Sequence, residues 1–161
     1  MKLVLSLFLW VHFVSTPDLS SIRKMYADVT KSEANAKEFS EKLSGISADD
    51  DKILVAYKAA SILLDSKFKN RLKDKMDRFK EGAKLLEATI KNDPNNIEMR
   101  MIRLSIQENV PGITGYRKNI KEDKKYLTDH YAEQSAALKE YLKNFVLQSK
   151  SFSEKEKQFV K

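Results

Sequence analysis

Apolar residues recur at spacings of three and four along almost the whole chain beyond residue 17, a pattern that predicts amphipathic helices with one buried face. The first apolar stripe consists of Ile22, Met25, Tyr26 and Val29. A second helix follows, because Ser32 is suited to cap a helix N-terminus and Gly45 is suited to end one. A single bent helix across residues 30–32 is the alternative interpretation.

Two further helices are expected between residues 47 and 92. Ser47 and Asp50 have the three-residue spacing of a capping box, which predicts that the third helix opens at Ser47. The fourth helix has the longest apolar stripe, which extends over about six turns and consists of Phe68, Leu72, Met76, Phe79, Ala83, Leu86 and Ile90. It ends at the sequence NDPNN, where Pro94 is suited to the first turn of the next helix.

The fifth helix, expected over residues 94–109, has apolar residues on two sides. At about 100° per residue, the two sides are formed by Ile97, Met101 and Leu104 and by Met99, Ile102 and Ile106. A surface helix has one apolar stripe. We therefore expect this helix to lie at the centre of the fold, between two layers.

Two arginines on this helix need partners, because an unpaired buried charge is very costly. Arg100, Arg103 and Gln107 share one polar strip, and Asp123 and Glu122 are the expected partners. These groups form structural ion pairs in one interpretation. In the other they form a carboxylate or phosphate site, because a guanidinium presents a bidentate fork to such anions. The candidate binding residues of that site are Arg100, Arg103, Gln107, Tyr116, Arg117 and Asp123.

The rest of the chain predicts a loop and three more helices. The loop PGITGY, residues 111–116, contains two of the four glycines. The first helix after it opens at Asn119, which is paired with Glu122. A longer helix follows, and a short C-terminal helix opens at Ser153, which is paired with Glu156.

No segment shows the strict alternation of a half-buried strand. The sequence therefore predicts an all-α fold, a repeat-like array of antiparallel helix pairs with about seven to eight helices. DPNN, after a helix with small residues at Gly82 and Ala83, is similar to the end of a tetratricopeptide repeat. The similarity covers about twenty residues, and no regular repeat period continues it.

Residues 1–16, MKLVLSLFLWVHFVST, predict a signal peptide for export. The apolar run is too short to span a membrane, since a spanning helix needs roughly 20 apolar residues. No A-x-A triplet follows, so cleavage is expected anywhere from about residue 15 to 21. A single helical domain over residues 17–161 is then expected. A buried N-terminal helix is the alternative interpretation of this segment.

Composition supports a helical fold and narrows the chemistry. The 4 Gly and 3 Pro residues are too few for the many turns of an all-β protein. The absence of cysteine excludes disulfides, thiolate zinc sites and cysteine nucleophiles. The net charge of +7 suits acidic partners, although interspersed charges also serve to keep a protein soluble.

Few residues offer catalytic chemistry. His130 is the only histidine beyond the signal segment, and no second histidine supports it as a metal ligand. The chain has no Gly-rich phosphate loop, no dinucleotide fingerprint and no G-x-S-x-G turn. We therefore expect no enzyme activity, no metal and no cofactor.

The fourth helix carries a strong positive charge. Residues 66–84 hold eight basic and three acidic side chains, and the bases flank both edges of the apolar stripe. An amphipathic helix that lies on an anionic membrane has this arrangement, but lysine stems also cover the margins of any core. We expect the stripe to belong to the core.

The fifth helix and the segment after it resemble a known family. They contain a Glu-x-Arg-x-x-Arg-x-x-x-Gln helix, a Pro-led loop ending near a Tyr, and an Ile-x-x-Asp helix start, at Glu98, Arg100, Arg103, Gln107, Pro111, Tyr116, Ile120 and Asp123. This pattern is similar to that of an uncharacterised family of small exported all-helical proteins typical of Bacteroidetes-type bacteria. Gly112 and Thr114 depart from it, since bulkier apolar residues are usual there. The resemblance implies a helical fold and export, and no activity.

These features predict an exported helical protein of the periplasm or cell envelope, which binds a protein or peptide in a groove between helix pairs. The alternative is a peripheral protein that binds anionic lipid or glycan through its basic helix edges. An enzyme that uses Arg100, Arg103 and His130 is a third possibility. Nucleic acid is not an expected partner, because no aromatic-interleaved basic motif occurs. The sequence leaves the oligomeric state open.

Overall fold

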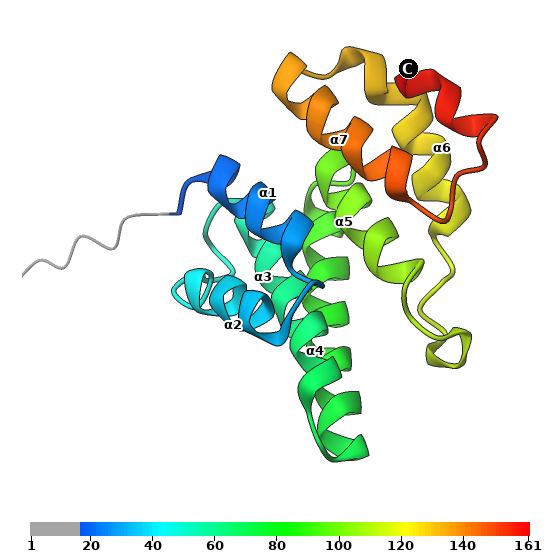
Figure 1. The fold of residues 1–161 in the computed structure, drawn as a ribbon. Helices are drawn as coiled ribbons and strands as arrows, with labels where there is room; N and C mark the ends of the chain where they lie inside the picture. Colours follow the sequence, from blue (N-terminus) through cyan, green and yellow to red (C-terminus); the bar gives the residue numbers. More distant parts are fainter. Residues whose placement is uncertain (1–16) are drawn as a thin grey trace, which may run out of the picture.

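The computed structural model describes residues 17–161, which form helices joined by short connections (Figure 1). Within these residues there are seven α-helices and no strand, which confirms the all-α prediction. The α-helices are α1 (Leu19–Asp28), α2 (Glu33–Lys42), α3 (Lys52–Asp65), α4 (Leu72–Asn92), α5 (Ile97–Gln107), α6 (Ile120–His130) and α7 (Ala136–Gln148). The short 3-10 helices are η1 (Ser66–Phe68), η2 (Gly112–Thr114), η3 (Tyr131–Glu133) and η4 (Glu156–Val160). The signal peptide prediction lies outside the described residues, and the antiparallel pairing of successive helices stays a prediction.

Polar side chains cap the N-termini of five of the seven α-helices in residues 17–161. Ser32 accepts a hydrogen bond from the N–H of Asn35 at 3.1 Å and caps α2. The chain therefore forms two helices around residues 30–32 rather than one bent helix. Asn96 caps α5 in the same way, by accepting from the N–H of Met99 at 3.1 Å. Such bonds satisfy N–H groups that have no partner within the first turn.

The third helix begins later than predicted. Ser47 does bind Asp50, whose carboxylate accepts from the Ser47 N–H at 2.6 Å. This bond closes a turn ahead of the helix, and Asp51 caps α3 by accepting from the N–H of Ile53 at 2.9 Å. The prediction that the helix opens at Ser47 was wrong because a second capping aspartate stands closer to the apolar run.

Other helices are also shorter than predicted at their N-termini. Phe68 lies in η1, ahead of α4. Pro94 lies in the turn between α4 and α5, because Asn96 takes the capping position. Ser135 caps α7, which begins at Ala136. In each of these helices that has a side-chain cap, the helix begins after the polar residue nearest to its apolar stripe.

Helix α5 lies at the centre of the fold, as its two apolar sides predict. Every residue of α5 except Ser105 is buried. Helices α3, α4 and α6 all pack against it. Any charged side chain on α5 therefore needs a partner from within the chain.

Helix α4 packs closely on α3 in its middle. A Cβ atom at Gly82 would lie 2.8 Å from the carbonyl oxygen of Ala59 and 2.7 Å from Cγ of Leu63. Real side chains do not approach so closely, so the contact requires glycine at this position. Further along, Asp65 at the end of α3 accepts a hydrogen bond from Arg78 at 3.0 Å.

The first turns of α4 extend past the end of α3 and project from the rest of the molecule (Figure 1). Leu86 and Ile90 near the other end of α4 are buried in the core. Phe68, Leu72 and Met76 are exposed. The prediction that the whole stripe belongs to the core was therefore wrong for its first part, because α3 stops at Asp65 and leaves that part uncovered.

Candidate binding site

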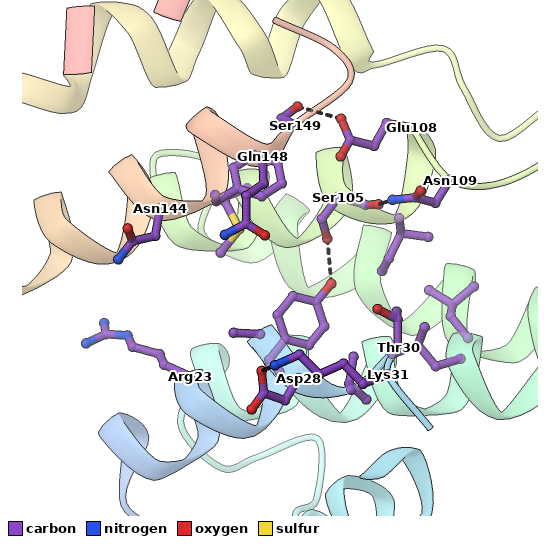
Figure 2. Close-up of a pocket in the computed structure, with 18 of the residues that line it drawn as sticks. Arg23, Asp28, Thr30, Lys31, Ser105, Glu108, Asn109, Asn144, Gln148 and Ser149 are labelled. Atoms are coloured by element: carbon purple, nitrogen blue, oxygen red, sulfur yellow. Dashed lines mark hydrogen bonds and ion pairs between the residues drawn. The ribbon is translucent and has the colours of Figure 1, made fainter. Parts of the chain in front are cut away.

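A groove of about 820 Å³ lies between α1 and α7, with α5 along its floor. Figure 2 shows the groove with side chains from all three helices directed into it. The end of α3 and the adjoining part of α4 contribute the remaining wall. The groove therefore joins segments from the two ends of the described chain.

The floor of the groove is apolar. It is lined by Leu63, Leu64, Phe79, Met101, Ile106 and Val110. Tyr26 of α1 reaches across it, and its hydroxyl forms a hydrogen bond of 2.5 Å with the hydroxyl of Ser105 (Figure 2). Burial raises the pKa of Tyr26 to about 12, so this phenol stays protonated and keeps its hydrogen bond at neutral pH.

The long edges of the groove carry polar and charged groups (Figure 2). Helix α7 contributes the exposed amides of Asn144 and Gln148. The opposite edge includes Arg23 and Asp28 of α1, and Asp28 pairs with Lys31 at 2.6 Å. The groove therefore combines an apolar floor with hydrogen-bonding edges.

A buried carboxylate holds Arg23 at the base of the groove. Nε and Nη2 of Arg23 donate to the two oxygens of Glu98 at 2.7 and 2.6 Å. The Tyr57 hydroxyl donates to the same carboxylate at 2.7 Å and forms a hydrogen bond of 3.0 Å with the Tyr141 hydroxyl. Glu98 is only 3% exposed, and these bonds compensate for its lost hydration. The four side chains come from α1, α5, α3 and α7, and so fix these helices relative to one another.

Electrostatics favour this arrangement. The hydrogen bond to Glu98 raises the pKa of Arg23, so that its guanidinium stays charged. Burial raises the pKa of Tyr57 well above its ordinary value, and the neighbouring Tyr141 and Glu98 add to this shift. A neutral phenol is the form that can donate a hydrogen bond to Glu98.

The other end of the groove is held by Glu108, which directly follows α5. Its carboxylate accepts hydrogen bonds from the Ser149 hydroxyl at 2.5 Å and from the Ser151 N–H at 3.1 Å. Lys150 donates to the side-chain oxygen of Asn109 at 2.9 Å. These bonds join the end of α7 to the end of α5, so that hydrogen bonds set the width of the groove at both ends.

The arginines predicted as a site lie on the other polar side of α5. Nε and Nη2 of Arg103 donate to both oxygens of Asp123 at 2.7 and 2.6 Å, and its Nη1 donates to Glu87 at 2.9 Å. Nη1 of Arg100 donates to Asp123 at 3.1 Å and to Glu122 at 2.8 Å. The structure therefore confirms Asp123 and Glu122 as the partners expected from the sequence.

The ionisation of this cluster reflects burial and pairing together. Burial raises the pKa of Asp123, while the guanidinium groups of Arg103 and Arg100 oppose that shift. Burial lowers the pKa of Arg103, but its bonds to Asp123 and Glu87 outweigh burial and raise it overall. The bond from Arg100 lowers the pKa of Glu122. Both arginine forks are thus directed at carboxylates of the chain itself.

Two more candidate residues join this cluster and one does not. The Tyr116 hydroxyl donates to Glu87 at 2.7 Å. The amide of Gln107 donates to the Asn119 side chain at 3.3 Å and accepts from the Asn119 N–H at 3.2 Å. Arg117 is exposed beyond the loop and lies outside the cluster. These contacts favour the structural interpretation of Arg100 and Arg103, and a ligand role for the six candidates stays a prediction.

His130 lies at the end of α6, away from the groove lining. Its ring nitrogen Nδ1 is 3.0 Å from a carboxylate oxygen of Glu133, and its ring stacks on Tyr126 with centroids 4.2 Å apart. Residues 17–161 contain no group of three or more side chains placed to hold a metal ion. The lining of the groove offers apolar contact, hydrogen bonding and charged groups.

We found no match to this chain among protein-family models, curated proteins or solved structures. The resemblance to small exported helical proteins therefore stays a prediction. In the described part of the chain, none of the helices has the length and apolar character needed to cross a bilayer.

Sequence reasoning did not find the groove, although one local signal existed. On α7, Ala137, Tyr141, Asn144 and Gln148 recur at spacings of four and three, beside the apolar stripe of that helix. Ser20, Arg23 and Ala27 form a similar line on α1. A second line of mixed residues beside a buried stripe indicates a face that is neither core nor open surface, but it does not indicate which helices oppose each other.

Proposed function

We propose that this protein is an exported, non-enzymatic binding module that holds a peptide segment of a partner protein in the groove between α1 and α7. The groove itself is the observation that carries the proposal. Its volume of about 820 Å³ falls within the range of about 300–1,000 Å³ that is usual for ligand sites. Export depends on residues 1–16 acting as the signal segment.

The chemistry of the groove suits a peptide. Each peptide residue other than proline presents one N–H donor and one C=O acceptor along its backbone. The side-chain amides of Asn144 and Gln148 offer both a donor and an acceptor, and both line one edge of the groove. The apolar floor can take the side chains that such a segment turns away from the edges. A purely apolar ligand would use only the floor of the groove, and a purely charged ligand would use only its edges.

The charged groups around the groove favour binding over catalysis. Arg23 is engaged by Glu98, and Glu108 by Ser149 and Ser151. A general base or a nucleophile must be free to reach its substrate. The carboxylate of Glu108, which lines the groove, and that of Glu98, which lies behind Arg23, instead hold the walls.

The groove is also organised before a ligand arrives. The hydrogen bonds of Glu98 at its base and of Glu108 at its end hold α1, α5 and α7 in place. A site that needs little ordering loses less conformational entropy on binding. This supports selective binding of an extended segment by a small protein.

Selection from a library of random peptides displayed on phage tests the proposal, with the full chain as the target. We expect enrichment of short sequences with apolar side chains, and competition among them for one site. Replacing Gln148, on the edge of the groove, by the bulky Trp (Gln148→Trp) should weaken binding of a selected peptide about tenfold or more, which is about 1.4 kcal/mol. The measurement is the dissociation constant of a synthetic peptide by fluorescence anisotropy.

Leu147→Trp is the matched control. Leu147 is the neighbouring residue of α7, is 38% exposed and does not line the groove. This variant should bind the selected peptides as the unaltered chain does. Failure to enrich any peptide would contradict the proposed function, and equal weakening by both variants would show that the peptide binds elsewhere.

A further inference from the structure

The first part of α4 presents apolar side chains to solvent. Leu72 is 75% exposed, Met76 42% and Phe68, just ahead of the helix, 39%. Leu72 and Met76 are four residues apart on α4 and therefore lie along one line, and Phe68 precedes them in η1. A contiguous exposed apolar patch of this kind marks an interaction surface more often than chance exposure of single residues does.

Basic side chains border this line on both sides. At about 100° per residue, Lys73 and Lys80 of α4 lie along one edge and Lys75 along the other, and Lys69 and Arg71 stand just ahead of the helix. Asp74, Asp77 and Glu81 lie further round the helix, and two of them pair with these bases, Asp74 with Arg71 at 2.7 Å and Asp77 with Lys73 at 3.3 Å. We call the exposed apolar line and its basic edges the α4 face. Its charge is positive, although the acids of the same stretch are close by in sequence.

We propose that the α4 face docks this protein on an anionic lipid surface. The exposed apolar line enters the boundary between headgroups and acyl chains. The lysine and arginine side chains extend sideways and bind the headgroup phosphates. This surface is separate from the peptide groove in its chemistry, and the proposal does not depend on the groove being occupied.

The combination of features favours lipid over other anionic partners. A polyanionic glycan or a nucleic acid would use the basic edges but would leave Leu72 and Met76 in water. A protein partner with an apolar groove would not need basic groups on both edges. A helix that lies in a membrane interface uses both, because its apolar side is buried in lipid and its cations remain at the level of the headgroups.

The position of the α4 face allows this contact. The first turns of α4 project from the body of the molecule, on the side away from α6 and α7 (Figure 1). A flat surface can therefore approach Leu72 without meeting those helices. Helix α4 is too polar to cross a bilayer, so the contact is with the surface of the membrane.

Vesicle co-sedimentation of the full chain tests the proposal. We expect strong binding to vesicles of phosphatidylcholine mixed with phosphatidylglycerol, weaker binding to phosphatidylcholine alone, and a decrease as salt is added, because salt screens the lysine–phosphate attraction. Removing the apolar line with Leu72→Ser and Met76→Ser should lower partitioning about tenfold. Reversing charge with Lys73→Glu and Lys75→Glu should lower it to a similar extent on the mixed vesicles only.

Matched controls are available elsewhere in the chain. Leu147→Ser removes an exposed apolar residue from α7. Lys121→Glu with Lys125→Glu reverses two exposed lysines on α6, and Lys125 forms an (i, i+4) ion pair with Asp129 as Lys73 does with Asp77. Both controls should bind vesicles as the unaltered chain does. Residues 1–16 are present in every variant, so any lipid binding of their own is the same background in each.

Several results would overturn the proposal. Unchanged vesicle binding by the Leu72/Met76 variant would do so, because loss of binding in the charge variant alone would show that the apolar line does not enter the membrane. Equal losses in the control variants would show that binding is not located on α4. Since the altered side chains are exposed, circular dichroism should show the same helical content in all variants. Failure of peptide selection would leave these results unaffected, so the two proposals can fail separately.

Discussion

Asp123 is a fully buried carboxylate whose surroundings show how this protein keeps charge in its interior. It accepts two hydrogen bonds from Arg103 and one from Arg100, and its side chain is 0% exposed. Removing one partner from such a pair leaves an uncompensated buried charge, which costs more than the pair contributes when intact. Arg103 is therefore expected to matter for stability whether or not it has any ligand.

Arg103→Ala should lower the free energy of unfolding by about 3 kcal/mol or more, measured by urea denaturation followed by circular dichroism. Arg103→Lys should lose less, because it keeps the charge but not the bidentate geometry. Arg117→Ala, at an exposed position, is the control and should change stability by about 0.5 kcal/mol at most. A fully stable Arg103→Ala variant would contradict the structural role and favour the ligand-site interpretation.

Glu156 gives a pH dependence of known sign. The N–H of Ser153, Lys124 and the Ser153 hydroxyl all bind its carboxylate and lower its pKa from 4.5 to about 2. A lowered pKa in the folded protein stabilises the fold at pH values above the ordinary pKa. That contribution is lost as the pH falls from about 4.5 through about 2.

Glu156→Gln should therefore be less stable than the unaltered chain at neutral pH, and the difference should shrink as the pH falls through this window. The measurement is urea denaturation at a series of pH values, supported by an NMR titration of the Glu156 carboxyl group. Glu38→Gln, on the exposed side of α2, serves as the control. A difference that stays constant with pH would show that the carboxylate charge is not involved.

At the scale of elements, the contact between α3 and α4 depends on one position. Gly82→Ala would place a Cβ atom 2.7 Å from Cγ of Leu63 and 2.8 Å from the Ala59 carbonyl oxygen. Alanine is the better helix former by about 1 kcal/mol, but overpacking of this kind costs about 1–3 kcal/mol. The Ala59 carbonyl oxygen belongs to the backbone and cannot move aside as a side chain can, so we expect a net destabilisation.

Thermal unfolding followed by circular dichroism should show a lower midpoint for Gly82→Ala than for the unaltered chain. Gly112→Ala is the control, since nothing lies within 4 Å of a Cβ there and the change should be nearly neutral. An unchanged or raised midpoint for Gly82→Ala would mean that α3 and α4 can separate slightly without loss.

Local patterns in the sequence are sufficient to predict the position of some helices in the fold. The two apolar sides of α5 predict its central position, because no surface helix needs two. The same reasoning predicts that Arg100 and Arg103 need acidic partners. Helix starts are less certain where two capping residues compete within a few positions, as Asp51 does with Ser47.

Other features depend on contacts that no local pattern specifies. The apolar line of α4 has the same spacing where it is buried as where it is exposed, and the difference arises because α3 ends at Asp65. The groove arises because α1 meets α7 across α5. Arg23 and Glu98 are 75 residues apart, and nothing in either segment alone indicates the pairing.

At the scale of the whole molecule, α5 is shared by the two ends of the chain. Arg23 reaches it from 75 residues before Glu98, and Asp123 reaches Arg103 from 20 residues after it. Tyr57 and Tyr141, which are 84 residues apart, meet beside Glu98. Neither half of the described residues covers α5 alone, so we predict that residues 17–161 unfold as one cooperative unit.

The burial of α5 on all sides has a consequence for timing. While the ribosome still holds the segment that becomes α6 and α7, α5 has no cover on its second side, and its arginines have no Asp123 to bind. Contacts between distant residues also form slowly, because the intervening chain must close first. The core therefore closes only after α6 and α7 have left the ribosome. Until then the nascent chain stays unfolded. An unfolded chain is what a translocation channel for unfolded proteins requires.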